Sequence, residues 1–297
     1  MADEPSDNFG KIEELTDDLL PEPFLIDDVS LAKIDRESEF LRISFELLKE
    51  MGHWLIILAG LATEPLDLNP AIIRGHTVRL AKLTRTMVRE MIQDEPGQQL
   101  ALVREIIETV ATLAYLLGDT DGTRYTAYIQ DGLVAEREMV KEITINVADR
   151  GAALDIENRM LRSIQSKAAA ARIADVLTLP GRAKIGFPSA EDRIKLLGLN
   201  AYIAYRASSS EVHGTWIDLR RNHLEQVGDK FLPNLAQLSI RPQPPLAMAY
   251  VLVSVYTATL ARHVEPQQIA FFEKRFEDLL DRTKRVDAAH EAWLQTV

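Results

Sequence analysis

Apolar residues recur every three or four positions along most of the chain, which is the spacing of one face of an α-helix. Strict alternation of apolar and polar residues is nearly absent, so we expect no extended sheet. Ser30 is a candidate N-cap of the first helix, and Ser189 with Asp192 resembles a capping box that opens the sixth. The pattern predicts an all-α, multi-helix bundle with helices over residues 30 to about 62, 71–93, 98–117, 124–149, 153–177, 189–213, 246–263 and 266–292.

Prolines and charge divide the chain into regions. Residues 1–28 combine Pro5, Pro21 and Pro23 with dense acid, and we expect a flexible or loosely packed segment. A helical domain is expected over residues 29–230, with a C-terminal helical hairpin, residues 231–297, packed on it. The Pro- and Gly-rich loop over residues 178–190 either separates two lobes or is one long connection within a single domain.

The net charge of −11 is unevenly distributed. Residues 1–50 hold five Lys/Arg and fifteen Asp/Glu, or 5 − 15 = −10, whereas residues 150–225 hold twelve against eight, or +4. The acidic N-terminal segment either covers this mildly basic region or only increases the solubility of the protein. The chain has no cysteine, which excludes thiolate metal sites and fits a reducing cytoplasm. The longest apolar run, around Trp54–Ala62, is too short to cross a membrane.

The most informative segment is Tyr205–Gly214. Ile194, Leu197, Ala201, Tyr205, Ser208 and Val212 form the expected buried stripe of its helix. Tyr202, Arg206, Ser209 and His213 form a second stripe, about 100° away. Gly214 suits the left-handed residue that ends a helix, so His213 is expected in the last turn. A permanent cation and an imidazole on one face can together bind a phosphodiester and transfer a proton to or from it.

An Arg followed by six residues and a His, late on a helix of an all-α protein, resembles the signature of HEPN domains. The run Tyr205-Arg206-x-x-Ser209-x-x-Val212-His213-Gly214 looks like an uncharacterised bacterial family of this type. The segment Leu102-Val-Arg-Glu-Ile-Ile-Glu108 looks like that family's earlier helix. The resemblance covers about residues 40–220, but only these two segments are specific.

The resemblance implies a metal-independent endoribonuclease or an RNA-binding protein of a toxin or phage-defence module, acting as a homodimer and needing no cofactor. His213 would transfer protons at the ribose 2′-OH, and Arg206 would hold the scissile phosphate. The products would be a 2′,3′-cyclic phosphate and a 5′-hydroxyl. Active relatives often carry a polar residue after the Arg; here it is Ala207, and Ser209 or Ser210 could supply that hydrogen bond. An antitoxin or defence protein is the implied partner.

Two other interpretations stay open. Arg206 and His213 could instead be structural, bonded to carboxylates such as Glu108 or Glu211, in a non-catalytic helical interaction protein. On the second helix, one face carries Arg79, Lys82, Arg85 and Arg89. This strip is either an ordinary solvated face or a track for the RNA backbone.

The other motifs in the sequence are weaker evidence of a functional site. Asp119-Thr-Asp-Gly-Thr123 matches a phosphatase motif, but it follows a helical series and predicts an interhelical turn. Glu50-x-x-His53 and Asp287-x-x-His290 have the spacing of di-iron ligands, and we expect them at the surface with no metal. His76, His223 and His263 have no companions at ligand spacing, and Trp54, Trp216 and Trp293 are expected to fill the core or an interface.

Overall fold

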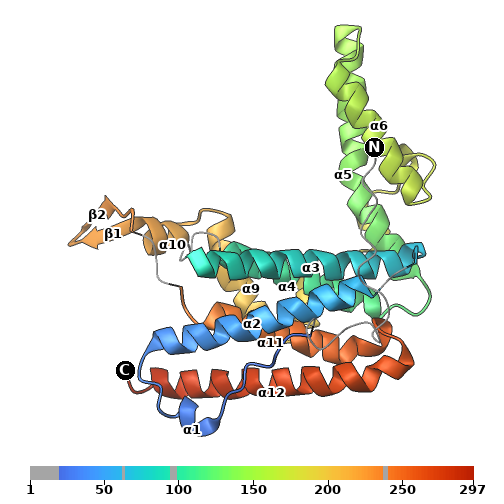
Figure 1. The fold of residues 1–297 in the computed structure, drawn as a ribbon. Coiled ribbons are helices and arrows are strands. Elements are labelled where there is room, and N and C mark those ends of the chain that lie inside the picture. Colours follow the sequence, from blue (N-terminus) through green and yellow to red (C-terminus); the bar gives the residue numbers. More distant parts are fainter. Residues whose placement is uncertain (1–19, 62–63, 94–98, 237–239) are drawn as a thin grey trace, which may run out of the picture. The chain divides into compact units, whose positions relative to one another are not determined.

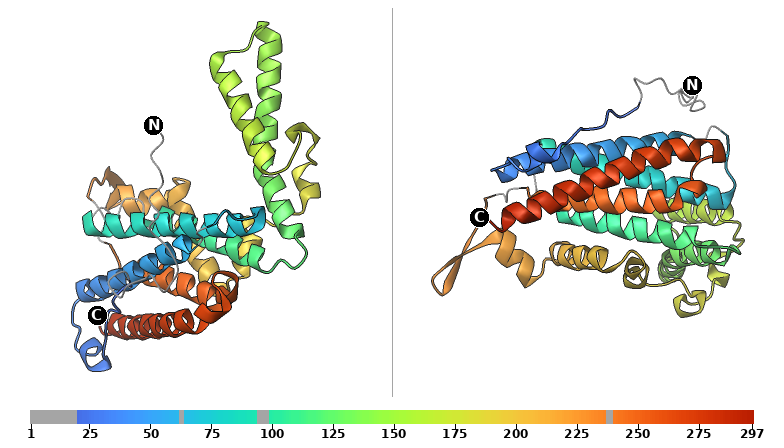
Figure 2. Two further views of the ribbon diagram at one scale, coloured as in Figure 1. Left: turned by 45° about the vertical axis from the view of Figure 1, so that its right-hand side comes forward. Right: turned by 90° about the horizontal axis from the view of Figure 1, so that it is seen from below.

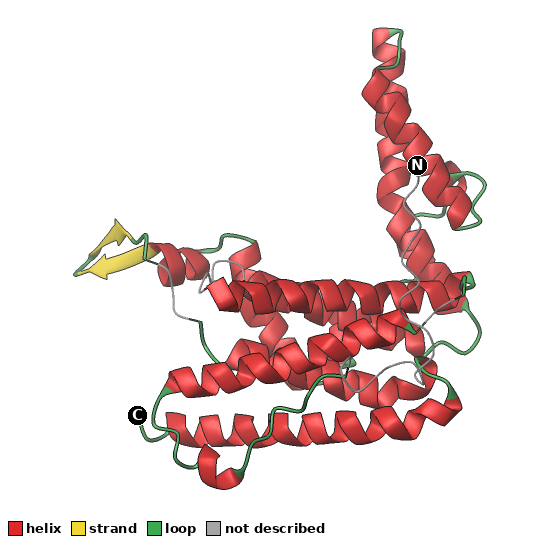
Figure 3. Cartoon of the chain, in the orientation of Figure 1, coloured by secondary structure: helices red, strands yellow, loops and turns green. Residues whose placement is uncertain are grey.

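The all-α prediction is confirmed by a computed structural model, which describes residues 20–61, 64–93, 99–236 and 240–297 (Figures 1 and 3). Its α-helices are α1 Asp28–Leu31, α2 Glu37–Gly60, α3 Leu68–Gln93, α4 Gln99–Leu117, α5 Thr123–Arg150, α6 Asp155–Ala170, α7 Arg182–Ile185, α8 Ala190–Lys195, α9 Leu199–Val212, α10 Trp216–Asp218, α11 Gln243–Thr259 and α12 Ile269–Leu294. Short 3-10 turns cover Val176–Thr178, Leu260–Arg262 and Pro266–Gln268, and a π-helical turn covers Leu219–His223.

The helices form two compact units. The first joins the described residues of 20–117 to those of 190–297, and the second comprises residues 118–189. In the first unit, α2 packs on α3, α3 on α4 and α4 on α9, while α11 contacts α2, α4 and α12. Figure 2 shows α2, α11 and α12 running alongside one another in both views. The core of this unit contains Leu47, Leu55, Leu80, Ile106, Val110, Leu252, Phe272 and Phe276.

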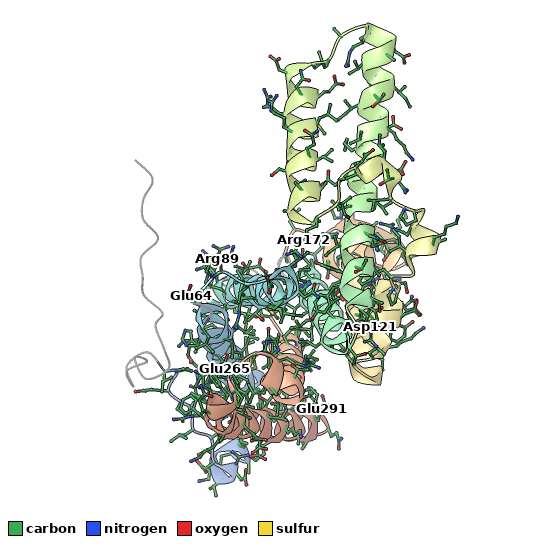
Figure 4. All side chains as sticks on the ribbon, turned by 90° about the vertical axis from the view of Figure 1, so that its right-hand side faces the viewer. Glu64, Arg89, Asp121, Arg172, Glu265 and Glu291 are labelled. Carbon is green, nitrogen blue, oxygen red and sulfur yellow. The ribbon has the colours of Figure 1, made fainter. Side chains whose placement is uncertain are left out.

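The second unit is built on a helical hairpin. Helices α5 and α6 run back against each other, and the segment after α6 folds onto α5. Its small core consists of Leu133, Ile164, Ala168, Val176 and Leu179. The Arg137 guanidinium donates to the carbonyls of Leu179 and Pro180, which fixes the returning segment. Beyond this core, the side chains of α5 and α6 project into solvent (Figure 4).

Three helix boundaries differ from those predicted. Asp27, rather than Ser30, caps the first helix, which is the short α1; its carboxylate accepts from the Ser30 N–H at 2.8 Å. α6 ends at Ala170, not near residue 177, because Arg172 adopts a left-handed conformation. The predicted sixth helix is two helices, α8 and α9, because Gly198 between them has φ +97°.

Two short strands were not predicted from the sequence. β1 Leu224–Val227 pairs antiparallel with β2 Lys230–Pro233, with Leu224 opposite Pro233. The hairpin extends away from the helices of its own unit (Figures 1 and 3). Its side chains are mostly exposed, so the alternation of apolar and polar residues that reveals a half-buried strand is missing.

One stretch of the described chain, Gln243–Arg262, is long and apolar enough by length and composition to cross a membrane. Its run of uncharged residues is longer than the Trp54–Ala62 run, which was therefore wrongly taken as the longest. α11 lies within this stretch and buries Leu246, Met248, Leu252, Val253 and Tyr256 inside the first unit. A helix buried in this way forms part of the core of its unit.

A buried ion pair fastens the N-terminal segment to the bundle. Glu50 on α2 and Arg282 on α12 are 5% and 2% exposed and form two hydrogen bonds, at 2.7 and 2.8 Å. Arg282 also donates to the Phe24 carbonyl, and the Phe24 N–H donates to Glu50. The prediction that Glu50 lies at the surface was therefore wrong, because its carboxylate is the counter-ion of a buried guanidinium.

The other residues of the two di-iron-like motifs are also placed by the structure. His290 is fully buried between Phe40 and Trp293, contrary to the surface position predicted for it. His53 and Asp287 are exposed, as expected. Among the described residues, no three His, Cys, Asp or Glu side chains are grouped so that they could hold a metal ion.

Candidate functional site

The two segments singled out in the sequence meet in the structure. Residues 102–108 lie on α4 and residues 205–212 on α9, and these helices pack directly against each other. Ser208 and Ala201 on α9 and Ile194 on α8 are buried, as predicted, whereas Val212 is exposed where α9 leaves the bundle. Helix packing thus brings an arginine of α4 to the C-terminal end of α9.

That arginine is Arg104, which donates hydrogen bonds in three directions. Its Nε donates to Glu108 Oε1 at 2.9 Å, and its Nη2 donates to the Tyr205 hydroxyl at 3.2 Å. Its Nη1 lies 3.2 Å from His213 Nε2. The guanidinium carbon is also 4.9 Å from the centre of the Tyr205 ring. Arg104 is therefore held in one position by a carboxylate, a phenol and an imidazole.

The contact with Arg104 selects one tautomer of His213. A guanidinium has only donors, so Nε2 must accept and the neutral ring carries its proton on Nδ1. His213 directly follows the last residue of α9, and Gly214 takes the predicted left-handed conformation with φ +54°. The imidazole is exposed, so a ligand in solvent can reach it.

Tyr205 and Glu108 complete the cluster. Partial burial, followed by the negative charge of Glu108, raises the pKa of the Tyr205 phenol. Tyr205 therefore stays protonated near neutral pH, so its hydroxyl can accept from Arg104 and donate to Glu108. Glu108 was predicted as a supporting residue, and its carboxylate lies beside Arg104, not beside Arg206.

Arg206 lies on the outer face of α9. It is two residues from the fully buried Ser208, which is a rotation of about 200° around the helix. Within the described part of the chain, no hydrogen bond or ion pair holds its guanidinium. Its charge acts on Glu191: the Lys195 ammonium, then the Tyr202 hydroxyl and Arg206 hold the pKa of Glu191 below its usual value.

The other predicted supporting residues have local partners. The Ser209 and Ser210 hydroxyls donate to the carbonyls of Tyr205 and Ala207, inside their own helix. The Tyr202 hydroxyl donates to Glu191 at 3.1 Å. These hydrogen bonds fix the local geometry of α8 and α9. In the stripe formed by Tyr202, Arg206, Ser209 and His213, the guanidinium of Arg206 is thus the polar group for which no partner is described.

The four basic residues of α3 divide into two kinds. Arg79 is paired, because its guanidinium donates to Glu105 at 3.0 Å and to Thr109 at 3.1 Å on α4. Lys82, Arg85 and Arg89 are exposed and form no ion pair with a described residue; Arg89 is labelled in Figure 4. These three side chains, which we call the basic strip, are available to an anionic ligand.

The remaining sequence motifs are structural. Asp119 accepts from the N–H groups of Asp121, Arg124 and Tyr125, and Asp121 accepts from Thr123, so the phosphatase-like motif is an interhelical turn, as predicted. Burial lowers the pKa values of His76 and His263 to about 4, with nearby arginines adding to the effect. His223 lies 3.7 Å from the buried carboxylate of Asp218.

Sequence reasoning missed Arg104 and Tyr205 as site residues, although both lie in the two quoted segments. Arg104 and Glu108 are four residues apart, which is the spacing of an ion pair on a helix surface. That signal predicts the pair, but it does not reveal the histidine 109 residues further along the chain.

The chain belongs to a protein family of unknown function, DUF5677, whose model matches residues 71–231. The match covers just over half of the chain and includes most of α3, the helices from α4 to α10, and β1. Arg104, Glu108, Tyr205, Arg206 and His213 all lie within it. No curated protein and no solved structure matches the chain.

Proposed function

We propose that the protein is a metal-independent endoribonuclease of the HEPN type, in which His213 transfers the proton and Arg104 holds the scissile phosphate. The observation that carries the proposal is the 3.2 Å contact between Arg104 Nη1 and His213 Nε2 at an exposed position. A fixed cation beside a titratable imidazole combines charge stabilisation with proton transfer, the two things that cleavage of a phosphodiester requires.

The contact also suggests how binding would start the reaction. A phosphate attracts the Arg104 guanidinium more strongly than a neutral imidazole does, because the hydrogen bond is charge-assisted. Once Arg104 turns to the phosphate, the Nε2 lone pair is free to accept the proton of the ribose 2′-OH. The O2′ then attacks phosphorus, the bond to O5′ breaks, and O5′ takes a proton from a second imidazolium. The products are a 2′,3′-cyclic phosphate and a 5′-hydroxyl.

The second imidazolium would come from another copy of the chain. The HEPN resemblance implies a homodimer in which two Arg/His sets share one cleft. In such a dimer, Arg206, which no described partner holds, would supply a further contact to the phosphate. Pairing two sites also allows one histidine to act as base while the other acts as acid.

The basic strip of α3 supports RNA as the substrate. Lys82, Arg85 and Arg89 occupy the exposed face of one helix, so they can follow a phosphate backbone without competing acidic partners among the described residues. We place the reaction in the cytoplasm, as part of a toxin or phage-defence module whose partner is an antitoxin or defence protein. These assignments rest on the resemblance.

The test is cleavage of a single-stranded RNA by the purified full-length chain in EDTA. We expect 2′,3′-cyclic phosphate ends, and we expect His213→Ala to reduce the rate by at least about a hundredfold. His53→Ala is the matched control, because that imidazole is also exposed and lies on α2, outside the Arg104 cluster. Equal cleavage by wild type and His213→Ala would rule out the proposed chemistry.

A non-catalytic interaction protein is the second candidate, and the end of the α5–α6 hairpin favours it. Ile145, Leu154 and Ile156 are each half or more exposed there. Exposed aliphatic groups at the end of a helical hairpin are typical of a surface that binds another protein. If the chain cleaves no RNA but Leu154→Ser abolishes a stable complex with a partner protein, this function holds instead.

A further inference from the structure

An exposed aromatic pair lies just beyond the candidate site. The segment after His213 forms α10, the π-helical turn and the β hairpin, which together we call the arm, residues 216–233. Trp216 is 57% exposed and Phe231 is 40% exposed. Trp216 was expected to fill a core or an interface, but in this chain its indole is largely open to solvent.

The two rings form a single, ordered surface. Their centroids are 5.4 Å apart and their planes are almost perpendicular, at 89°. The Arg220 guanidinium lies 5.8 Å from the centre of the Phe231 ring, and it also donates to the Gln226 side chain at 3.1 Å. At the base of the arm, Asn222 donates to the buried Asp218 carboxylate at 2.7 Å. These contacts hold the aromatic pair in place without covering Trp216.

The position of this surface relates it to the proposed chemistry. Trp216 is three positions after His213, so their Cα atoms lie within about 11 Å of each other. The Thr215 N–H donates to the Ser210 carbonyl of α9, which ties the start of the arm to the helix that precedes His213. A nucleotide next to a phosphate at His213 would therefore come close to the indole.

We propose that Trp216 and Phe231 form a stacking platform for an unpaired base of single-stranded RNA, next to the phosphodiester held by Arg104 and His213. This inference rests on the proposed function and names its substrate class. The flat face of an aromatic ring, such as the exposed Trp216 indole, accepts any base, because every base has a π-face. In a double helix, the bases are stacked on one another and are not available to the platform.

The charges of the arm indicate that stacking, more than phosphate attraction, would provide this contact. The arm contains Arg220, Arg221 and Lys230, and against them Asp218, Glu225 and Asp229, so it has no net charge. A binding contribution from stacking depends weakly on salt, whereas one from phosphate contacts falls steeply as salt rises. The effect of removing the indole should therefore be similar at low and high salt.

The experiment measures binding of a short, labelled, single-stranded RNA to the full-length chain by fluorescence anisotropy, with His213→Ala in every protein to prevent cleavage. Trp216→Ala should raise Kd about tenfold or more at both low and high salt. Trp216→Phe, which keeps a flat ring, should recover much of the loss. Leu235→Ala is the matched control: this residue is 96% exposed, just after the arm, and offers no ring for stacking.

Three results would overturn the platform: an unchanged Kd in Trp216→Ala, an equal loss in Leu235→Ala, or equal affinity for single strand and duplex. The second result would indicate a general apolar surface that binds a protein. Cleavage is assayed separately, so the two proposals can fail independently. Binding that depends on Trp216 without any cleavage supports the platform and rejects the nuclease; cleavage without such binding does the reverse.

Discussion

Arg104 Nη1 lies 3.2 Å from His213 Nε2, although His213 is 109 positions further along the chain. The contact forms because α4 packs on α9 and because α9 ends at Val212, directly before His213 and the left-handed Gly214. The same guanidinium is held by Glu108 and Tyr205, so the pair belongs to a fixed cluster. This relationship replaces Arg206 with Arg104 as the cation directly beside the imidazole.

Replacing Arg104 by Lys should separate the geometry of the guanidinium from its charge. Lysine is a point charge and cannot reach Glu108, Tyr205 and His213 at once, so we expect cleavage to fall about a hundredfold. Arg206→Lys keeps the positive charge, and no described hydrogen bond at this position requires the forked geometry of a guanidinium. This variant should therefore retain most of the activity. The measurement is the initial cleavage rate of the two variants under identical conditions; the reverse ranking would reject Arg104 as the phosphate ligand.

The buried ion pair of Glu50 and Arg282 predicts that removing one charge lowers the free energy of unfolding much more than removing both. Arg282→Met leaves the Glu50 carboxylate buried without a counter-ion, so we expect the free energy of unfolding to fall by about 3–5 kcal/mol. Changing both residues to Met should restore most of that loss. Urea unfolding followed by circular dichroism measures both variants. A double variant less stable than Arg282→Met would contradict this interpretation.

Stability should decrease as the solution becomes mildly acidic. His263 has a pKa of about 4 when folded, against an ordinary value of 6.5, because it is buried and lies near Arg74. The unfolded chain therefore binds a proton that the folded chain does not, and stability is lost as pH falls below 6.5 toward 4. By linkage, His263 alone should cost about 2 kcal/mol between pH 7 and pH 5.

The control for this effect is His263→Gln, which removes the titrating ring and keeps a polar group near Thr259, 3.2 Å from His263 Nε2. Its stability should vary less with pH than that of the wild type, with the partly buried His76 still providing part of the dependence. Identical pH profiles for the two proteins, measured by chemical unfolding, would show that His263 titrates normally in the folded state.

The basic strip predicts how RNA affinity depends on salt. Each phosphate contact to a single strand contributes about 0.7 to the slope of log K against log salt. Changing Lys82, Arg85 and Arg89 together to Gln should therefore reduce the slope by about 2. Changing Arg159 and Arg162 on α6 to Gln is the matched control and should leave the slope unchanged. An unaltered slope in the triple variant would identify the strip as an ordinary solvated face.

Helical periodicity was sufficient to predict the class of fold and most helices, because an amphipathic helix displays its buried face in its own sequence. The turn at Asp119–Thr123 and the left-handed conformation of Gly214 just after α9 were also predictable from local chemistry. The β hairpin was not, because its strands bury neither face. The break at Gly198 was missed because a glycine within an apolar run is compatible with a continuous helix.

The candidate site was only partly predictable. His213 and Glu108 could be selected by residue type and by resemblance, but the cation beside His213 depends on which helix packs against α9. The register of α4 on α9 is a tertiary property that no local spacing of Arg206 and His213 encodes. The burial of Glu50 likewise follows from Arg282, 232 residues away on α12.

The most direct measurement is a double-mutant cycle on RNA cleavage in EDTA, using wild type, Arg104→Ala, His213→Ala and the variant with both changes. If the two side chains act as one unit, the double variant should be no slower than the slower single variant, because each change alone already disables the unit. Rate losses that simply multiply, or a His213→Ala variant as active as wild type, would contradict the account.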